Sequence, residues 1–192
     1  MTPLLAFDTS AAHCAAALHL GDRVVARVEP MAKGQAERLM GFLEEVLAAE
    51  GLGWSDLAAL GVGCGPGNFT GLRIGVSAAR GLALGLGIPA IGVSGFEAAV
   101  LGHPRPVTVA LPAPRDHLWL QRLTENGAEA PTLAPAAQAG EVLHAPEADP
   151  LVRAIAEIAC GRAATPQPRP APLYVRPADA APPHDPAPVL IG

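Results

Sequence analysis

The first side chains in the chain that could do chemistry are the carboxylate of Asp8 and the hydroxyls of Thr9 and Ser10. They follow the apolar run 3–7, so Asp8 stands at the end of a predicted strand. There it could hold a divalent cation with partner carboxylates, face the phosphate and metal of a nucleotide, or merely cap a turn. No spacing singles out a partner among the other carboxylates considered, Glu37, Glu44, Asp56 and Glu97. All three interpretations stay open.

A second candidate region is the glycine-rich stretch Leu60–Leu86, which predicts a short buried strand, a turn and a long helix. The turn formers Gly65-Pro66-Gly67-Asn68 separate the two elements. Asn68 or Thr70 can cap the helix, because a short side-chain oxygen can accept an amide of its first turn. Together with the strand-end cluster, this turn supplies the candidate residues for nucleotide contact: Asp8, Thr9, Ser10, Gly65 and Gly67.

Two known phosphate-binding motifs do not match this stretch. A P-loop needs a lysine and a hydroxyl residue directly after its last glycine, but Gly71 is followed by Leu72 and Arg73. The dinucleotide fingerprint fails as well, because the glycines give only the looser GxGxxxG. Residues 82–95 also contain no acidic side chain for a ribose. A Rossmann-type redox protein is accordingly disfavoured.

The remaining nucleophiles and metal ligands are scattered along the chain. No two of the histidines stand three to five residues apart, as two ligands on one helix face would. No serine lies in a GxSxG elbow. The three cysteines are an odd number at wide spacing, which matches neither a metal site nor a disulfide framework and fits a reducing cytosol. We predict no catalytic residue and no metal site.

Composition narrows the class of protein. Half of the 192 residues are hydrophobic and only 16% are charged, which indicates a globular chain. The net charge of −5, with scattered Lys and Arg, disfavours strong binding of nucleic acid by this chain alone. The N-terminus lacks the basic start of a signal peptide, and the uncharged stretch 81–96 is broken by Pro89. We expect a cytoplasmic protein with no membrane segment.

The order of predicted elements indicates the fold. Three strands in a meander come first, followed by an alternation of helices and strands up to residue 101. This order is typical of a ribonuclease-H-like lobe, the unit duplicated in actin-like proteins. We predict an α/β, actin-like fold with two lobes, residues 1–101 and a smaller lobe 102–192. Nine prolines between 166 and 188 predict an extended tail, in which the apolar patch 172–177 docks on the body.

Small and apolar side chains share a face on each of two predicted helices. In helix 35–50 the residues Leu39, Leu43, Val46 and Leu47 recur with helical spacing, and in helix 70–86 Gly71, Gly75 and Ala79 recur every four residues. Glycines on one helix face suggest close approach, either by the protein's own sheet or by another polypeptide. The candidate partner surface comprises Leu39, Met40, Leu43, Gly71, Ile74, Gly75 and Ala78.

Several segments resemble the bacterial TsaB family of the glycoprotease-like group. They are LLAFDTSAAHCAAAL, QAERLMGFLEEVL and LGVGCGPGNFTGLRIGVSAARGLALGLGIPAIGVSGFEAA, and the tail PLYVRPADA is similar to the family's C-terminal signature. The resemblance covers residues 4–101 and 172–180. This sequence departs from the pattern at Asn68, where a serine is usual, and at 33–36, where relatives usually carry a histidine and a serine.

The resemblance implies an actin-like fold and work in making threonylcarbamoyladenosine beside the tRNA anticodon. It implies a non-catalytic subunit that docks on and activates the catalytic paralogue TsaD, joined by the ATPase TsaE. It also implies tRNA contact only through that complex, no cofactor of its own, and ATP or ADP in the assembly at most. Because an apolar patch on a monomer usually has a partner, the isolated chain could also pair with itself through the same helix face, and monomer and homodimer both stay open. The alternative is a stand-alone nucleotide-dependent transferase or glycoprotease-like hydrolase that uses Asp8.

Overall fold

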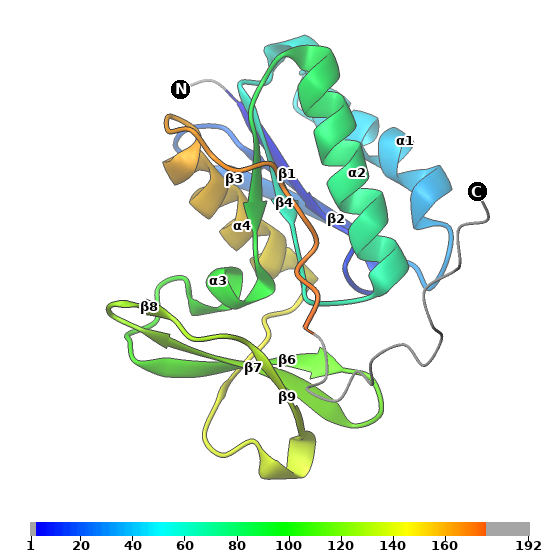
Figure 1. The fold of residues 1–192 in the computed structure, drawn as a ribbon. Helices are drawn as coiled ribbons and strands as arrows, with labels where there is room; N and C mark the ends of the chain where they lie inside the picture. The colour runs from blue at the N-terminus through cyan, green and yellow to red at the C-terminus, as the bar shows by residue number, and fades with distance from the viewer. Residues whose placement is uncertain (1–2, 176–192) are drawn as a thin grey trace, which may run out of the picture.

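The computed structural model describes residues 3–175, which form two β-sheets and the helices around them (Figure 1). The first sheet contains β1 (Leu4–Asp8), β2 (His13–His19), β3 (Val24–Pro30), β4 (Ala59–Gly63) and β5 (Ala90–Val93). The second contains β6 (Val107–Ala113), β7 (His117–Thr124), β8 (Gly127–Ala128), β9 (Thr132–Pro135) and β10 (Leu143–His144). The α-helices are α1 (Gln35–Ala49), α2 (Phe69–Leu86), α3 (Gly95–Val100) and α4 (Ala148–Arg162). Short 3-10 helices occupy Trp54–Asp56 and Ala136–Gln138.

The strand order of the first sheet is β3-β2-β1-β4-β5. β1, β2 and β3 pair antiparallel, whereas β1, β4 and β5 are parallel. Antiparallel strands can follow one another through tight turns, and parallel strands need a crossover, which α2 provides between β4 and β5. This is the ribonuclease-H-like topology of an actin-like lobe, and it confirms the predicted α/β fold class.

The first sheet is covered on both faces, because side chains alternate along its strands. In β1, Leu5 and Phe7 pack with α1 and α2, whereas Leu4 and Ala6 pack with α4. Alanine dominates the α4 side of β1 and β2, which lets α4 approach the sheet closely. Figure 1 shows α1 and α2 on one side of the sheet and α4 on the other.

The position of α4 depends on contacts that are far apart in the sequence. This helix follows the predicted lobe boundary at 101/102, yet it packs on the first sheet. A β-carbon on Gly61 would lie 2.9 Å from the Ala159 β-carbon, so the two backbones nearly touch here. The division of the chain at 101/102 stays a prediction.

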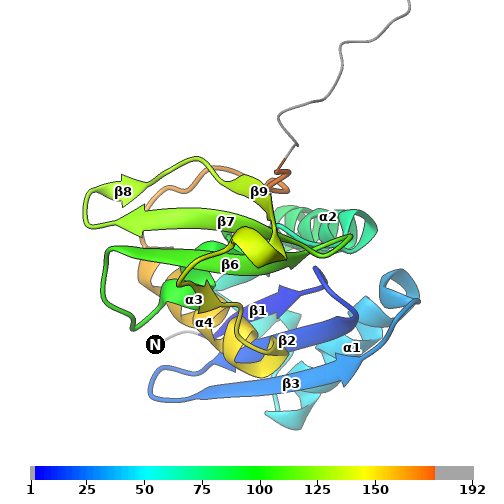
Figure 2. The same ribbon diagram turned by 90° about the horizontal axis from the view of Figure 1, so that it is seen from below.

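The second sheet packs on α3, which connects it to the first sheet (Figure 2). Its core includes Phe96, Val109 and Leu123. The tail also docks here: the Leu173 amide donates to the Cys64 carbonyl at 2.7 Å, and the Leu173 side chain packs on the same core. Docking of the apolar patch is therefore confirmed for residues 172–175, whereas 176 and 177 lie outside the described residues. Among residues 3–175, no helix is both long and apolar enough to cross a membrane.

Candidate functional site

Asp8 lies at the carboxyl end of β1 and is almost completely buried. Its Oδ2 accepts hydrogen bonds from the Ser10 backbone amide at 3.0 Å and from the Ser10 hydroxyl at 2.8 Å. The Nε2 atom of His13, the first residue of β2, lies 2.8 Å from the same oxygen. A buried carboxylate needs such partners, because an unpaired one would cost several kcal/mol. Asp8 therefore organises the turn between β1 and β2.

Three of the predicted nucleotide-contact residues, Thr9, Ser10 and Gly67, come together where two loops pack on one another. The Thr9 hydroxyl donates to the Gly71 carbonyl at 2.7 Å, and the Asn68 backbone amide donates to the Ser10 carbonyl at 2.7 Å. A β-carbon at Gly67 would overlap the Ser10 carbonyl. Gly67 therefore has no room for a side chain because the β1–β2 turn lies directly against it, whereas a β-carbon at Gly65 would instead meet the Leu72 side chain at 2.8 Å.

This packing changes the interpretation of Asp8. The turn-capping role, one of the three alternatives, accounts for the contacts of its Oδ2 atom. Within the described part of the chain, no three His, Cys, Asp or Glu side chains gather as a metal site would require. A phosphate between the two loops would require them to separate, since their backbones touch. Nucleotide contact stays a prediction.

Four of the seven predicted partner-contact residues lie inside the protein. Leu39 and Leu43 are 1% and 0% exposed and belong to the core between α1 and the first sheet. Gly71 and Gly75 are buried against Thr9, where a β-carbon at Gly75 would lie 2.6 Å from the Thr9 hydroxyl. The prediction is wrong at these positions, because the small face of α2 meets the protein's own β1–β2 turn.

The other three predicted partner residues remain accessible. Met40 is exposed, and Ile74 and Ala78 are half-buried. Met40 and Ala78 belong to an open groove between α1 and α2 with a volume of about 540 Å³. Its lining contains no charged side chain and consists of Met40, Trp54, Ala78, Gly81, Leu82, Gly85 and Leu86. We call this surface the helix groove.

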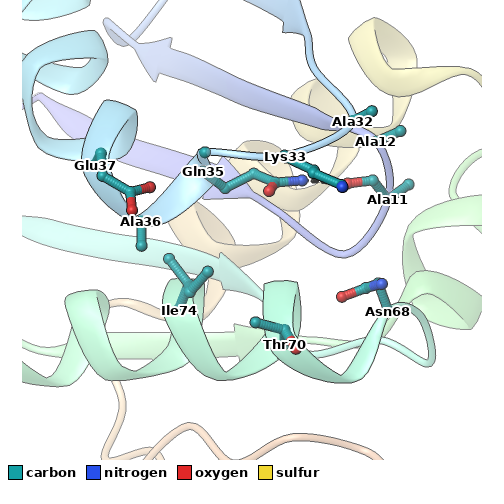
Figure 3. Close-up of a pocket in the computed structure, with 11 residues that line it drawn as sticks. Ala11, Ala12, Ala32, Lys33, Gln35, Ala36, Glu37, Asn68, Thr70 and Ile74 are labelled. Carbon is teal, nitrogen blue, oxygen red and sulfur yellow. Dashed lines mark hydrogen bonds between the residues drawn. The ribbon is translucent and has the colours of Figure 1, made fainter.

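A second cavity, of about 420 Å³, lies between the β1–β2 turn and the first turns of α1 and α2 (Figure 3). Ile74 and Thr70 line it from α2, and Lys33, Gln35 and Glu37 line it from the start of α1. The Gln35 side-chain amide donates to the Ala11 carbonyl at 3.3 Å. This cavity contains the segment 33–36 in which the sequence departs from the TsaB pattern. Its charged and amide groups could bind a polar ligand.

Helix α2 begins where the sequence indicated. Asn68 is its N-cap, and the Asn68 side-chain oxygen accepts a hydrogen bond from the Gly71 amide at 2.9 Å. Thr70, the other predicted cap, lies inside the helix. The asparagine that replaces the usual serine therefore performs the capping role, since both residue types accept such a bond.

Ser94 and Glu97 fix α3 between the two sheets. Their side chains form a reciprocal capping box at the start of this helix, and Glu97 also accepts a 2.6 Å bond from Arg162 of α4. Burial opposes ionisation of Glu97, but the hydrogen bonds from the Ser94 backbone and from Arg162 outweigh it and lower the pKa of the Glu97 carboxyl. An ionised Glu97 thus links α3 to α4.

Sequence reasoning missed two groups of residues. One is His13, a partner of Asp8 across the turn, which the five-residue separation around a tight turn could have indicated. The other comprises Trp54, Leu82 and Leu86 of the helix groove. Their helical spacing with Ala78 could have indicated the last two, whereas nothing local indicated Trp54.

Comparison with known proteins gives the relationships of the chain. The family model of TsaD, tRNA N6-adenosine threonylcarbamoyltransferase, matches residues 29–141. The tRNA threonylcarbamoyladenosine biosynthesis protein TsaB of Escherichia coli is 41% identical over 91 residues, 47% of this chain and 39% of that protein. TsaB of Haemophilus influenzae is 39% identical over 95 residues, 50% of this chain and 40% of that protein. The match thus spans about two fifths of these relatives' length.

A solved structure resembles most of the chain. It is a Pseudomonas aeruginosa protein described as uncharacterized, with similarity to the peptidase YeaZ; it has a TM-score of 0.69 and 25% identity. The similarity covers 92% of this chain and 100% of that one. The TsaD family model matches more than half of the 192 residues, and the curated relatives at about 40% identity carry the name TsaB. The chain therefore belongs to the TsaD family.

Proposed function

We propose that this chain is a non-catalytic subunit of the complex that transfers threonylcarbamoyl onto the tRNA adenosine next to the anticodon. In this proposal it docks on a TsaD-like catalytic paralogue and activates it. The supporting observations are the match to the TsaD family model, the name of the TsaB relatives and the helix groove.

The helix groove is the single observation that supports docking best. It lies between two helices on the same face of the first sheet, and its lining is entirely uncharged. Met40 is 39% exposed at its edge. Apolar surface of this kind on one chain is usually covered by a partner. A protein of the same fold would present similar helices, which could pack here helix against helix.

The proposed lack of catalysis follows from how Asp8 is used. A carboxylate that is buried and already accepts bonds from Ser10 and His13 is poorly placed to take a proton or hold a metal for a substrate.

We further propose that TsaE joins the assembly, that ATP or ADP enters only with the assembly, and that the isolated chain forms a homodimer through the helix groove. The assembly would work in the cytoplasm.

Two neighbouring substitutions test the docking. Ala78→Arg places a charge in the helix groove, and the matched control Ser77→Arg places the same side chain on an exposed position outside its lining. Each variant is co-expressed with TsaD from the same organism and analysed by size-exclusion chromatography. The Ala78→Arg variant should elute separately from TsaD, whereas the Ser77→Arg variant should co-elute with it. Co-elution of both variants would show that the helix groove is not the docking surface.

An activity measurement tests the function itself. In cells that lack the native chain, the unmodified protein should restore threonylcarbamoyladenosine in digested tRNA, as measured by mass spectrometry, and Ala78→Arg should not. Hydrolysis of ATP or of a peptide by the purified chain alone, lost on Asp8→Ala, would instead support the stand-alone enzyme.

A further inference from the structure

The exposed face of α2 carries a stripe of residues that neither the fold nor the helix groove uses. Phe69, Arg73, Ser77, Arg80 and Leu84 are all exposed, and their spacing of three or four residues places them on one side of the helix. Phe69 is 53% and Leu84 85% exposed. The residues of the helix groove lie on a different side of α2, because Ala78, Leu82 and Gly85 follow their own i, i+4, i+7 series.

The chain segment 163–175 runs alongside this stripe in the opposite direction (Figure 1). Its beginning faces the C-terminal half of α2 across a cavity of about 610 Å³, lined by residues such as Arg80, Leu84, Pro166 and Arg169. Its end reaches the N-terminus of α2, where Tyr174 packs on Phe69. The stripe and this segment together form one continuous surface, which we call the arginine face.

The arginine face differs in charge from the rest of the protein. Neither α2 nor residues 163–175 contain an acidic side chain, although the whole chain has a net charge of −5. Arg73, Arg80 and Arg169 form no ion pair with any residue from 3 to 175. By contrast, six other arginines are each within ion-pair distance of a carboxylate: Arg23, Arg27, Arg38, Arg122, Arg153 and Arg162.

Two aromatic rings lie beside Arg73, at the N-terminal end of this surface. The Phe69 and Tyr174 rings are 5.3 Å apart at their centroids, and the Arg73 guanidinium lies 3.9 Å from the centroid of Phe69. The Arg73 Nε–H donates to the Tyr174 hydroxyl at 3.1 Å, which holds the guanidinium in place. The Nη atoms of Arg73 form no hydrogen bond with another described residue. A ring that remains half exposed beside a fixed cation can stack with a planar ligand.

We propose that the arginine face binds single-stranded RNA, with a base stacked on Phe69 and phosphates along Arg73, Arg80 and Arg169. Unpaired cations with exposed aromatic rings beside one of them are features that recognise unpaired nucleotides. A protein partner is the weaker fit, because a row of three arginines without any carboxylate would need an acidic strip opposite it. The proposal does not depend on docking through the helix groove, although the two surfaces adjoin at Gly81, which lines both.

Binding of the isolated chain to RNA tests the proposal directly. The probe is a fluorescein-labelled single strand of about 12 nucleotides, within the site sizes of such surfaces, followed by anisotropy between about 50 and 200 mM salt. The unmodified chain should bind measurably at the lower salt. The triple variant Arg73→Ala, Arg80→Ala and Arg169→Ala should weaken binding at least tenfold and reduce the salt slope by about 2, since each phosphate contact contributes ~0.7.

Matched control variants test whether RNA binding depends on the arginine face or only on the net charge of the chain. The triple variant Arg23→Ala, Arg27→Ala and Arg122→Ala removes the same charge from ion-paired, exposed positions and should change binding little. Phe69→Leu keeps an apolar side chain without a ring and should weaken binding by about tenfold, whereas Phe69→Trp should restore it. Far-UV circular dichroism of each variant checks that the fold is retained.

Three results would overturn the proposal. The first is equal RNA binding by the two triple variants, and the second is no RNA binding by the unmodified chain at low salt. The third is loss of co-elution with TsaD in the Arg73, Arg80 and Arg169 variant with RNA binding unchanged, which would make the arginine face a protein interface. Failure of docking would appear separately, in the Ala78→Arg and Ser77→Arg pair.

Discussion

Helices α1 and α2 cover the same face of the first sheet but present very different surfaces to solvent. On α1, Arg38 donates to Glu29 of β3 at 2.8 Å and to Glu45 at 2.7 Å. Arg27 of β3 also lies 3.0 Å from Glu45, and both guanidinium groups lie within 5.6 Å of the Phe42 ring centroid. On α2, Arg73 and Arg80 have no carboxylate neighbour among the described residues. Arg38 and Glu45 of α1 are paired within the protein, whereas Arg73 and Arg80 of α2 remain available for a ligand.

Arg27, Glu29, Arg38 and Glu45 form what we call the α1 network, and its hydrogen bonds support this contrast. The bonds from Arg38 are the largest cause that lowers the pKa of the Glu29 and Glu45 carboxyls, so both stay ionised at neutral pH. The net charge of −5 belongs to the whole chain and therefore does not describe the local charge on either helix. The comparison teaches that the arrangement of charge, rather than its sum, decides which face of this protein can meet RNA.

The buried face of α2 is where a substitution should have the largest effect. Gly71→Ala would push a β-carbon into the Thr9 carbonyl, which is backbone and cannot rotate away. We expect a loss of about 3 kcal/mol in the free energy of unfolding, measured by urea denaturation. An unchanged midpoint would mean that α2 does not pack on the β1–β2 turn as described.

The matched control on the same helix is Gly81→Ala. A β-carbon at Gly81 would meet nothing within 4 Å, so only the higher helix propensity of alanine should count. We expect the free energy of unfolding to increase by about 0.5–1 kcal/mol, again measured by urea denaturation. The opposite signs of these two glycine substitutions would separate the buried side of α2 from its solvent side.

The link between α3 and α4 should show a smaller, pH-dependent effect. Because the folded protein lowers the pKa of Glu97, its ionised form contributes stability above the pKa of the unfolded chain, about 4.3. That contribution is lost as the pH falls through the folded pKa. Glu97→Ala should cost about 1 kcal/mol at pH 7 and progressively less as the pH falls through the folded pKa.

Glu97→Gln separates the charge from the cap. Glutamine can still complete a capping box, so this variant should lose less stability than Glu97→Ala and should lack the acid-dependent part. The stability of both variants is measured from urea midpoints across the pH range. If the stability difference between wild type and Glu97→Ala stayed constant with pH, this would contradict the role assigned to the carboxylate.

The smallest effect is expected in the α1 network. Exposed ion pairs contribute little, because solvent screens them and the side chains lose freedom. Arg38→Met should therefore reduce the free energy of unfolding less than Glu97→Ala does, and it should leave RNA binding unchanged. A weakening of RNA binding comparable to that of Arg73→Ala would remove the distinction between the two helices.

Local patterns in the sequence determined much of the fold. Helical spacing of Leu39, Leu43 and Leu47 predicted α1, and the turn formers before Asn68 placed the start of α2 correctly. The order of strands and helices led to the ribonuclease-H-like topology of the first sheet. These features depend on neighbours within a few residues, so they can be read along the chain.

Only the tertiary structure decided what each face meets. Spacing showed that Gly71 and Gly75 share a small face, but the partner of that face is Thr9, sixty-two residues from Gly71 in sequence. Likewise, the consecutive alanines of β2 indicate close packing without naming α4, and only the folded turn brings His13 within 2.8 Å of Asp8. Periodicity in the sequence indicates how apolar or how small the side chains on one face of an element are. The long-range contacts that cover the surface, or leave it open as on the arginine face, arise only when the chain folds.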